Sequence, residues 1–220
     1  DNIDSIIMFN TYDALVDEVK NGGGLAPLLA SGWEYADPTT LNITLKDGIK
    51  FHSGNILDAD DVVYSFNRLM DMGQGFSFLF GTVESVSAIN SNTVQFKTTE
   101  PFAPLVASLM RLAIVDKDDV QANTADGNYG DNGDYGEAYL LTTSAGTGAY
   151  KITQHDPNVK TVLTKNGDYF QGHNPKAPDE VIIKYSVEAA TIKTLLVRGE
   201  HEISSMWLPN EVLAALEKED

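Results

Sequence analysis

The chain has 220 residues, 42% of them hydrophobic and 21% charged, which is ordinary for a globular protein and long enough for a substantial core. Lys and Arg number 15 against 32 for Asp and Glu, so the net charge is −17. A surface of this sign repels phosphate backbones and anionic lipid headgroups, which disfavours nucleic acid and membrane surfaces as partners. The lack of cysteine excludes disulfide frameworks, zinc ribbons and thiol nucleophiles.

No stretch of the sequence approaches the roughly 18 apolar residues that a membrane-spanning helix needs. The first residues, Asp1 to Asp4, also lack the basic and apolar regions of a signal peptide. We therefore expect no membrane insertion of this segment. If the protein is exported, the sequence represents it after processing or trimming.

The beginning of the chain is predicted to form one short helix followed by strands. Three apolar residues share one face of a helix over residues 12–20, which the glycines at 22–24 would end. Apolar and polar residues alternate over 41–45, as in a half-buried strand. Lys46-Asp47-Gly48 predicts a turn, and residues 49–51 are expected to begin a partner strand.

The clearest helix is predicted for residues 58–70. Asp58 can cap its N-terminus, and Asp60 and Asp61 lie in the first turn, where the positive end of the helix dipole favours carboxylates. Capping explains this acidic cluster better than a metal site or an acid–base pair does. The apolar stripe of the helix consists of Val62, Val63, Phe66, Leu69 and Met70.

The middle of the chain is predicted to hold two strands, a helix and a surface loop. The strands are expected at 83–89 and 94–96, and the helix runs from Pro104 to about residue 110. Residues 123–136 are rich in Asp, Asn and Gly, which is typical of an exposed loop. This loop does not fit a calcium-binding EF-hand, because its sixth position carries Asp131 instead of glycine.

A second structured block is expected from Gly146 onwards. Residues 149–154 and 159–165 predict a hairpin, and the apolar run 181–183 is typical of a strand covered on both faces. A helix is predicted over 188–198, and a last one begins near Pro209. The order of elements indicates a mixed α/β or α+β chain.

Catalytic and cofactor motifs are missing from the sequence. Gly146-Thr147-Gly148 is too short for a phosphate-binding loop, and neither a Gly-x-Ser-x-Gly elbow nor a Ser-x-x-Lys pair occurs. The four histidines are scattered without metal-ligand spacing. A secreted hydrolase would require His52, His155 or His173 beside a serine and a carboxylate in one cleft. We therefore predict that the protein is not an enzyme and has no cofactor and no metal site.

Several segments, taken together and in chain order, match the motifs of a known protein family. They are Tyr12-Asp13-Ala14-Leu15-Val16, Leu25 to Glu34, Leu45 to Gly54 with Asp58 to Phe66, Glu100 to Leu105, Gly146 to Tyr150, Asn166 to Phe170 and Gly199 to Ile203. Together they resemble the family 5 extracellular solute-binding proteins, which include dipeptide, oligopeptide and nickel-complex receptors. In that family the Tyr12 segment corresponds to a helix.

The resemblance implies a periplasmic-binding-protein-like class II lobe with an inserted subdomain. Residues 1–36 plus 143–220 would form the core of this lobe, and residues 37–142 the insertion. Members of the family are about twice as long, so the second lobe is expected to be absent from this chain.

The resemblance also implies a function. The protein would be the substrate-binding component of an ABC importer, a monomer that captures di- or oligopeptides outside the cytoplasmic membrane and delivers them to the permease subunits. Its location would be periplasmic or extracellular, with a lipid anchor before trimming as one option. Alternative ligands within the same class are nickel or other metal chelates and oligosaccharides.

By analogy with the family, the candidate ligand-binding residues are Asn10, Tyr12, Arg111, Gly148 and Trp207. Trp207 could stack on a ligand or anchor the core. Arg111 could neutralise an acidic group of the ligand or pair with a neighbouring acid. Tyr12 is better explained by packing than by ligand contact.

Overall fold

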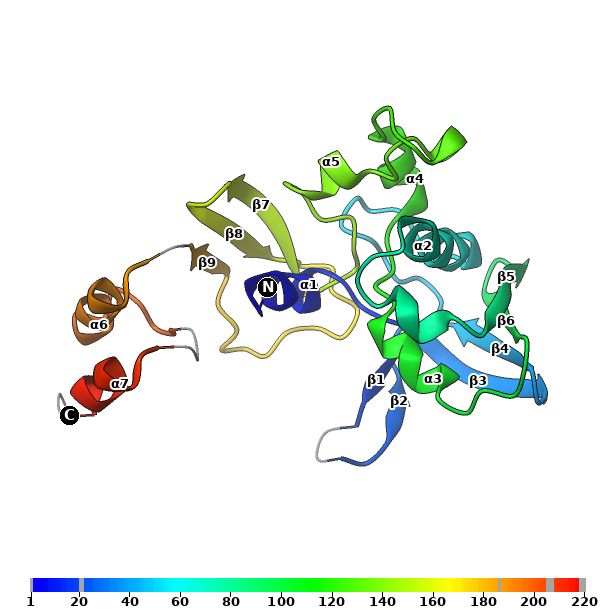
Figure 1. Cartoon of the computed structure of the whole chain (residues 1–220), viewed down its shortest axis with the longest axis horizontal. Helices are drawn as coiled ribbons and strands as arrows, with labels where there is room; N and C mark the ends of the chain where they lie inside the picture. Colours follow the sequence, from blue (N-terminus) through cyan, green and yellow to red (C-terminus); the bar gives the residue numbers. More distant parts are fainter. Residues whose placement is uncertain (1, 20–21, 186, 205–207, 218–220) are drawn as a thin grey trace.

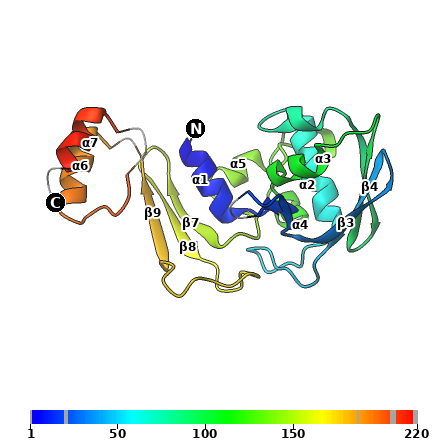
Figure 2. The same ribbon diagram turned by 90° about the horizontal axis from the view of Figure 1, so that it is seen from below.

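The computed structural model describes residues 2–19, 22–185, 187–204 and 208–217. The molecule is elongated, with helices α6 (Ala189–Val197) and α7 (Asn210–Leu216) at one end and a four-stranded sheet at the other (Figures 1 and 2). Helix α1 (Asn2–Thr11) lies between these ends. Within the described ranges, none of the helices has the length and apolarity required to cross a bilayer.

The predicted helix over residues 12–20 is wrong. The chain leaves α1 and forms strand β1 (Val16–Glu18), which pairs antiparallel with β2 (Leu25–Pro27). Gly22 and Gly24 adopt positive φ angles between these strands, so the glycine run serves a hairpin and not a helix end. Val16 is 1% exposed because the extended chain brings it into the core. A few apolar residues near glycines are compatible with either structure, and long-range packing decides between them.

The four-stranded sheet contains the strands predicted near residues 41–45, 83–89 and 94–96. Its order is β3-β4-β6-β5, all antiparallel, with bounds β3 (Ala30–Asp37), β4 (Thr40–Leu45), β5 (Val83–Asn90) and β6 (Thr93–Thr98). The partner strand expected at 49–51 is wrong. Both edges of β4 are already paired with β3 and β6, and Lys50 forms only an isolated bridge with Ile56.

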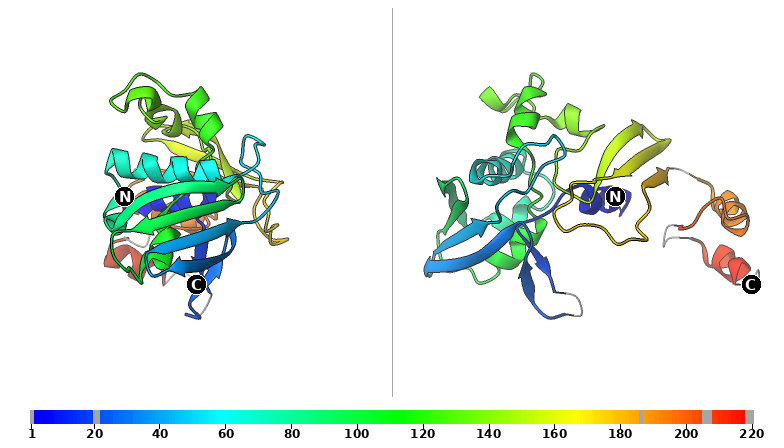
Figure 3. Two further views of the ribbon diagram at one scale, coloured as in Figure 1. Left: turned by 90° about the vertical axis from the view of Figure 1, so that its right-hand side faces the viewer. Right: turned by 180° about the vertical axis from the view of Figure 1, so that it is seen from behind.

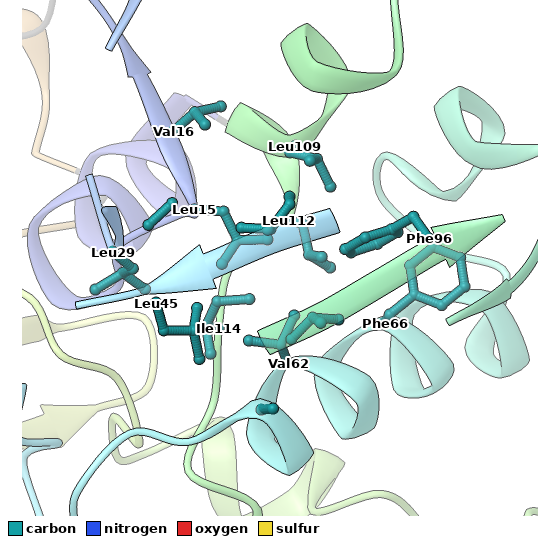
Figure 4. Close-up of a cluster of buried hydrophobic side chains, with 14 of the residues drawn as sticks. Leu15, Val16, Leu29, Leu45, Val62, Phe66, Phe96, Leu109, Leu112 and Ile114 are labelled. Carbon is teal, nitrogen blue, oxygen red and sulfur yellow. The ribbon is translucent and has the colours of Figure 1, made fainter. Parts of the chain in front are cut away.

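Helix α2 (Ala59–Met72) forms as predicted and crosses one face of this sheet (Figure 3). Asp58 caps it: its Oδ1 accepts from the Asp61 N–H at 3.2 Å, and the Asp58 N–H donates to Asp61 Oδ2 at 2.9 Å. Phe66 points from the helix into the core, where its ring meets Phe96 edge to face at a centroid distance of 5.8 Å (Figure 4).

The helix predicted from Pro104 is confirmed as α3 (Leu105–Ser108), which continues as the 3-10 helix η2 (Leu109–Arg111). The predicted loop 123–136 is mostly exposed, but Tyr135 within it is 2% exposed and donates a hydrogen bond to Asp71 Oδ2 at 2.6 Å. Short helical elements not expected from the sequence are η1 (Ser77–Phe80), α4 (Lys117–Ala122), η3 (Gly130–Asn132) and α5 (Glu137–Leu140).

The second block forms an antiparallel sheet in the order β7-β8-β9. Its strands are β7 (Tyr150–Asp156), β8 (Lys160–Lys165) and β9 (Glu180–Lys184), so the predicted hairpin is confirmed. The expectation that 181–183 is covered on both faces is wrong in this chain, since Ile182, on one face of β9, is 49% exposed. An apolar run shows that a strand is favoured, but it does not show what covers each face. Helices α6 and α7 lie where predicted.

One large core joins the N-terminal hairpin to the four-stranded sheet. Leu15 and Leu29 are packed in the same cluster as Leu45, Val62 and Phe96 (Figure 4). A second cluster, rich in tyrosine, lies beside it around Tyr64, Val115, Val120, Tyr135 and Ala145, with Tyr12 against it. The mixed α/β composition predicted from the sequence is confirmed.

Candidate ligand-binding site

The C-terminal end of α1 is pressed against the Gly146 loop, defined here as residues 144–148. The Gly148 N–H donates to the Thr11 carbonyl at 3.1 Å. A Cβ atom added at Gly148 would lie 2.6 Å from the Asn10 carbonyl oxygen, and one at Gly146 would lie 2.2 Å from the Thr11 oxygen. Glycine is therefore required at both positions because the two backbones approach so closely.

Tyr12 is part of the packing between α1 and this loop. Its ring covers Gly146, where an added Cβ would lie 2.6 Å from Tyr12 Cδ1, and its hydroxyl accepts from the Ala145 N–H at 3.3 Å. Burial raises the pKa of Tyr12 to about 12, so the phenol is neutral at physiological pH. These contacts agree with the packing role expected for Tyr12.

Asp13 ties three segments of the chain together. Its Oδ2 accepts from the Thr147 hydroxyl at 2.7 Å, and its Oδ1 accepts from the Tyr169 hydroxyl at 3.2 Å. Its backbone carbonyl accepts from the Ile114 N–H at 3.1 Å. Burial raises the pKa of the Asp13 carboxyl, against the effect of the two hydroxyl donors. Asp13 is not among the residues predicted for the site, although it lies in the Tyr12-Asp13-Ala14-Leu15-Val16 segment that carries the family resemblance.

His52 holds the other side of the Gly146 loop. Its Nδ1 lies 3.0 Å from Ser144 Oγ, its Nε2 lies 3.0 Å from the Gly148 carbonyl, and its backbone N–H donates to the Gly146 carbonyl at 2.8 Å. Burial lowers the pKa of His52, which favours the neutral ring. Asn166 Nδ2 donates to the same Gly148 carbonyl at 3.0 Å.

These contacts give His52 a structural role and not that of a hydrolase base. A serine lies beside one ring nitrogen, but the other faces a backbone carbonyl where a catalytic triad has a carboxylate. Ser144 Oγ also accepts from the Ile152 N–H at 3.1 Å. His155 and His173 have other partners, Thr161 Oγ1 and the Asn166 carbonyl oxygen.

Arg111, the last residue of η2, contacts two aromatic rings. Its Cζ lies 5.6 Å from the ring centroid of Phe9 on α1 and 5.3 Å from that of Phe76. Both distances are within the range of cation–π contacts. Arg111 is exposed, and it forms no ion pair with any acid in the described part of the chain. The expected alternative, pairing with a neighbouring acid, is therefore not seen among these residues.

The structure brings four of the five predicted site residues to one region. Asn10, Tyr12 and Gly148 meet at the end of α1, and Arg111 reaches α1 through Phe9. Asn10 is half-buried, and its Nδ2 donates to the Ile6 carbonyl at 2.7 Å within the same helix. The fifth prediction, Trp207, falls outside the described residues.

Two surface hollows lie away from this region. One, of about 330 Å³, lies between the end of α2 and α5, and the other, of about 240 Å³, is lined mainly by aspartates beside the start of α2. Neither contains a predicted site residue. Among the residues with described positions, there is no cluster of three or more His, Asp or Glu side chains suited to hold a metal ion.

Comparison with known proteins places the chain in a family. The model of the bacterial extracellular solute-binding proteins, family 5 (Middle), matches residues 24–220. The probable D,D-dipeptide-binding periplasmic protein DdpA of Escherichia coli (strain K12) is 30% identical over all of this chain and 42% of its own length. The nickel-binding protein NikA of Staphylococcus aureus (strain NCTC 8325 / PS 47) is 27% identical over 76% of this chain and 30% of its own.

A solved structure shows the same fold. The ABC transporter substrate-binding protein CtaP of Listeria monocytogenes superposes with a TM-score of 0.81 and 24% identity, over 100% of this chain and 43% of that one. The chain belongs to the family 5 bacterial extracellular solute-binding proteins, and the fold expected from the resemblance is confirmed. It spans less than half the length of the curated relatives it matches.

Proposed function

We propose that the protein containing this chain is the substrate-binding component of an ABC importer and that it captures di- or oligopeptides. The similarity that carries this proposal is the 30% identity, over the whole chain, to a protein named as a dipeptide-binding periplasmic protein. Family membership supports solute binding, and not catalysis, as its role. We expect it to act as a monomer outside the cytoplasmic membrane, where it would deliver solute to permease subunits.

The region around the end of α1 is suited to form one wall of a ligand site. Gly148 is fixed by the Thr11 carbonyl on one side and by His52 and Asn166 on the other. A site whose backbone is already fixed loses less entropy when a ligand binds. In this proposal Asn10 and Arg111 face a ligand that a second lobe covers from the other side, so that water is excluded. Gly148, which is buried, and the half-buried Tyr12, whose hydroxyl accepts from Ala145, would support this wall from behind, and the contact predicted for Trp207 stays a prediction.

The segment 37–142 is proposed as a subdomain inserted into the lobe formed by 1–36 and 143–220. The separate sheets support the second boundary of this division, because β4, β5 and β6 lie in one sheet and β7, β8 and β9 in another. The first boundary falls at the end of β3, which pairs with β4, and Leu15 and Leu29 share the core of the same sheet, so residues 1–36 pack against the proposed insertion.

A metal chelate is the second candidate ligand, because one relative is a nickel-binding protein. Native mass spectrometry of the complete gene product, purified without added ligand, separates the candidates. A bound mass that fragments into amino acids supports peptide uptake. A mass shift that appears only with a nickel chelate supports the metal alternative, and a sugar ladder supports oligosaccharides. A protein that binds none of these solutes would refute the importer proposal.

A further inference from the structure

The ring of His52 joins the two ends of the Gly146 loop. Its Nε2 lies 3.0 Å from the Gly148 carbonyl oxygen, and its Nδ1 lies 3.0 Å from Ser144 Oγ. A carbonyl oxygen can only accept a hydrogen bond, so Nε2 carries a hydrogen and donates it. In the neutral ring Nδ1 is then an acceptor, and the Ser144 hydroxyl donates to it. One neutral tautomer therefore satisfies both contacts.

Protonation of His52 disturbs this arrangement, because the charged ring carries a hydrogen on Nδ1 as well. The Ser144 hydroxyl then loses its acceptor. The new hydrogen can donate to Ser144 Oγ, which already accepts from the Ile152 N–H at 3.1 Å, or to the Ser144 carbonyl oxygen at 3.3 Å. Ser144 is buried, and a buried hydroxyl without an acceptor is unfavourable. The contacts of His52 therefore favour the uncharged ring.

The surroundings of the ring also oppose a positive charge. Burial lowers the pKa of His52, and so does the charge of Lys151, whose Nζ donates to the His52 carbonyl at 3.1 Å, against the opposite effect of the two carbonyls beside the ring. In the described part of the chain no acid forms an ion pair with this ring. Asp116 accepts from two side chains of the turn after His52 instead. On the α1 side of the loop, Asp13 accepts from two hydroxyls and Tyr12 is neutral.

Gly148 connects His52 with the end of α1. Its carbonyl accepts from two side chains, His52 Nε2 and Asn166 Nδ2, each at 3.0 Å. Its N–H donates to the Thr11 carbonyl at 3.1 Å, and its Cα packs so closely on the Asn10 carbonyl that an added Cβ would lie 2.6 Å from that oxygen. The Asn166 amide does not titrate and holds Gly148 at every pH, whereas the contribution of His52 depends on its protonation. The position of Asn10 therefore depends in part on the charge of His52.

We propose that His52 is a positioning residue for the ligand wall and that its protonation weakens solute binding, so that the protein holds its solute less tightly in an acidic medium. This rests on the proposed function and deepens it by naming a regulation of the same site. The direction follows from linkage: the folded protein favours the neutral ring, so the contribution of His52 is complete above the ordinary pKa of 6.5 and is lost as the pH falls below it.

The test measures peptide affinity against pH on the complete gene product. Titration calorimetry with Ala-Ala and Ala-Ala-Ala as probes is carried out at intervals from about pH 7.5 to about pH 4.5. The variants are His52→Gln and His52→Ala. His155→Gln is the matched control, because it makes the same change at a half-buried histidine on β7 whose Nδ1 bonds to Thr161 Oγ1 and not to the Gly146 loop. Nitrogen NMR of protein with labelled histidine reports the tautomer, and the signals that His52→Gln lacks belong to His52.

Wild type is expected to lose about fivefold more affinity than His52→Gln as the pH falls, the usual effect of losing one hydrogen bond. The glutamine amide can donate to the Gly148 carbonyl but cannot gain a proton, so this variant should bind well at neutral pH and keep its affinity in acid. His52→Ala should bind about fivefold more weakly at neutral pH and show the same flat profile, and His155→Gln should follow wild type. Asp61 titrates in the same range in all four proteins, so the readout is the difference between wild type and His52→Gln.

Other outcomes overturn the inference. Equal pH profiles for wild type and His52→Gln, or a hydrogen on Nδ1 and none on Nε2 at neutral pH, would refute it. Lower melting temperatures for both His52 variants with unchanged affinities assign His52 to stability alone. If wild type binds the peptides equally at every pH, the inference fails while the importer proposal stands. If wild type binds neither peptide, the proposal of peptide capture fails, and the inference fails with it.

Discussion

The close approach of Gly148 to α1 gives the sharpest prediction about stability. In Gly148→Ala, the new Cβ would lie 2.5 Å from the Thr11 carbonyl carbon, 2.6 Å from the Asn10 oxygen and 2.7 Å from Thr11 Cα. All three are backbone atoms, so the clash cannot be relieved by rotating a side chain. Overpacking of this kind costs about 1–3 kcal/mol. Losing the Gly148 N–H to Thr11 hydrogen bond adds about 1 kcal/mol, so we expect about 2–4 kcal/mol in total.

The matched control is Gly167→Ala. No heavy atom lies within 4 Å of its added Cβ, and its φ is not in the left-handed region. That change should be neutral or stabilise by up to about 1 kcal/mol, because alanine restricts the unfolded chain. Urea unfolding of both variants and wild type, followed by circular dichroism, measures the difference. Equal unfolding midpoints for the two variants would refute the close approach between the Gly146 loop and α1.

Three further changes test other parts of the fold by the same unfolding assay. Asp58→Ala removes the capping box of α2 and should cost about 1 kcal/mol, whereas Asp60→Ala, which removes a first-turn carboxylate that is not the cap, should cost less. Phe96→Ala empties a fully buried site and should cost about 3–5 kcal/mol, but Phe78→Ala, at a side chain 74% exposed, should have little effect. Burial raises the pKa of Asp61 from 3.8 to about 7, so the folded state holds the carboxyl proton more tightly than the unfolded state does, and stability should fall as pH rises from 4 to 7. Asp61→Asn should flatten this dependence of stability on pH, and an unchanged slope would contradict the raised pKa of Asp61.

Local signals in the sequence were sufficient where neighbouring residues determine the structure. Helix α2 begins after Asp58 because the cap and the acidic first turn are adjacent in the chain. The hairpin β7–β8 follows from two alternating runs around a short turn at Pro157. The same signals failed for residues 12–20, where a helix and a hairpin have similar local support. They also failed for residues 49–51, because both edges of β4 are paired with the distant or preceding strands β6 and β3, which local signals do not specify.

The sequence by itself determined the net charge, the mixed α/β composition and, through segments spread along the chain, the family. The tertiary structure alone decided which side chains meet. Asp13 and Thr147 are 134 positions apart, Asp13 and Tyr169 are 156 apart, and His52 and Gly148 are 96 apart, yet each pair is joined by a hydrogen bond. Propensity and capping act over a few residues, so they cannot specify such pairs. Packing of the whole chain brings them together, and the same packing leaves Arg111 beside two aromatic rings and without an acid among the residues described.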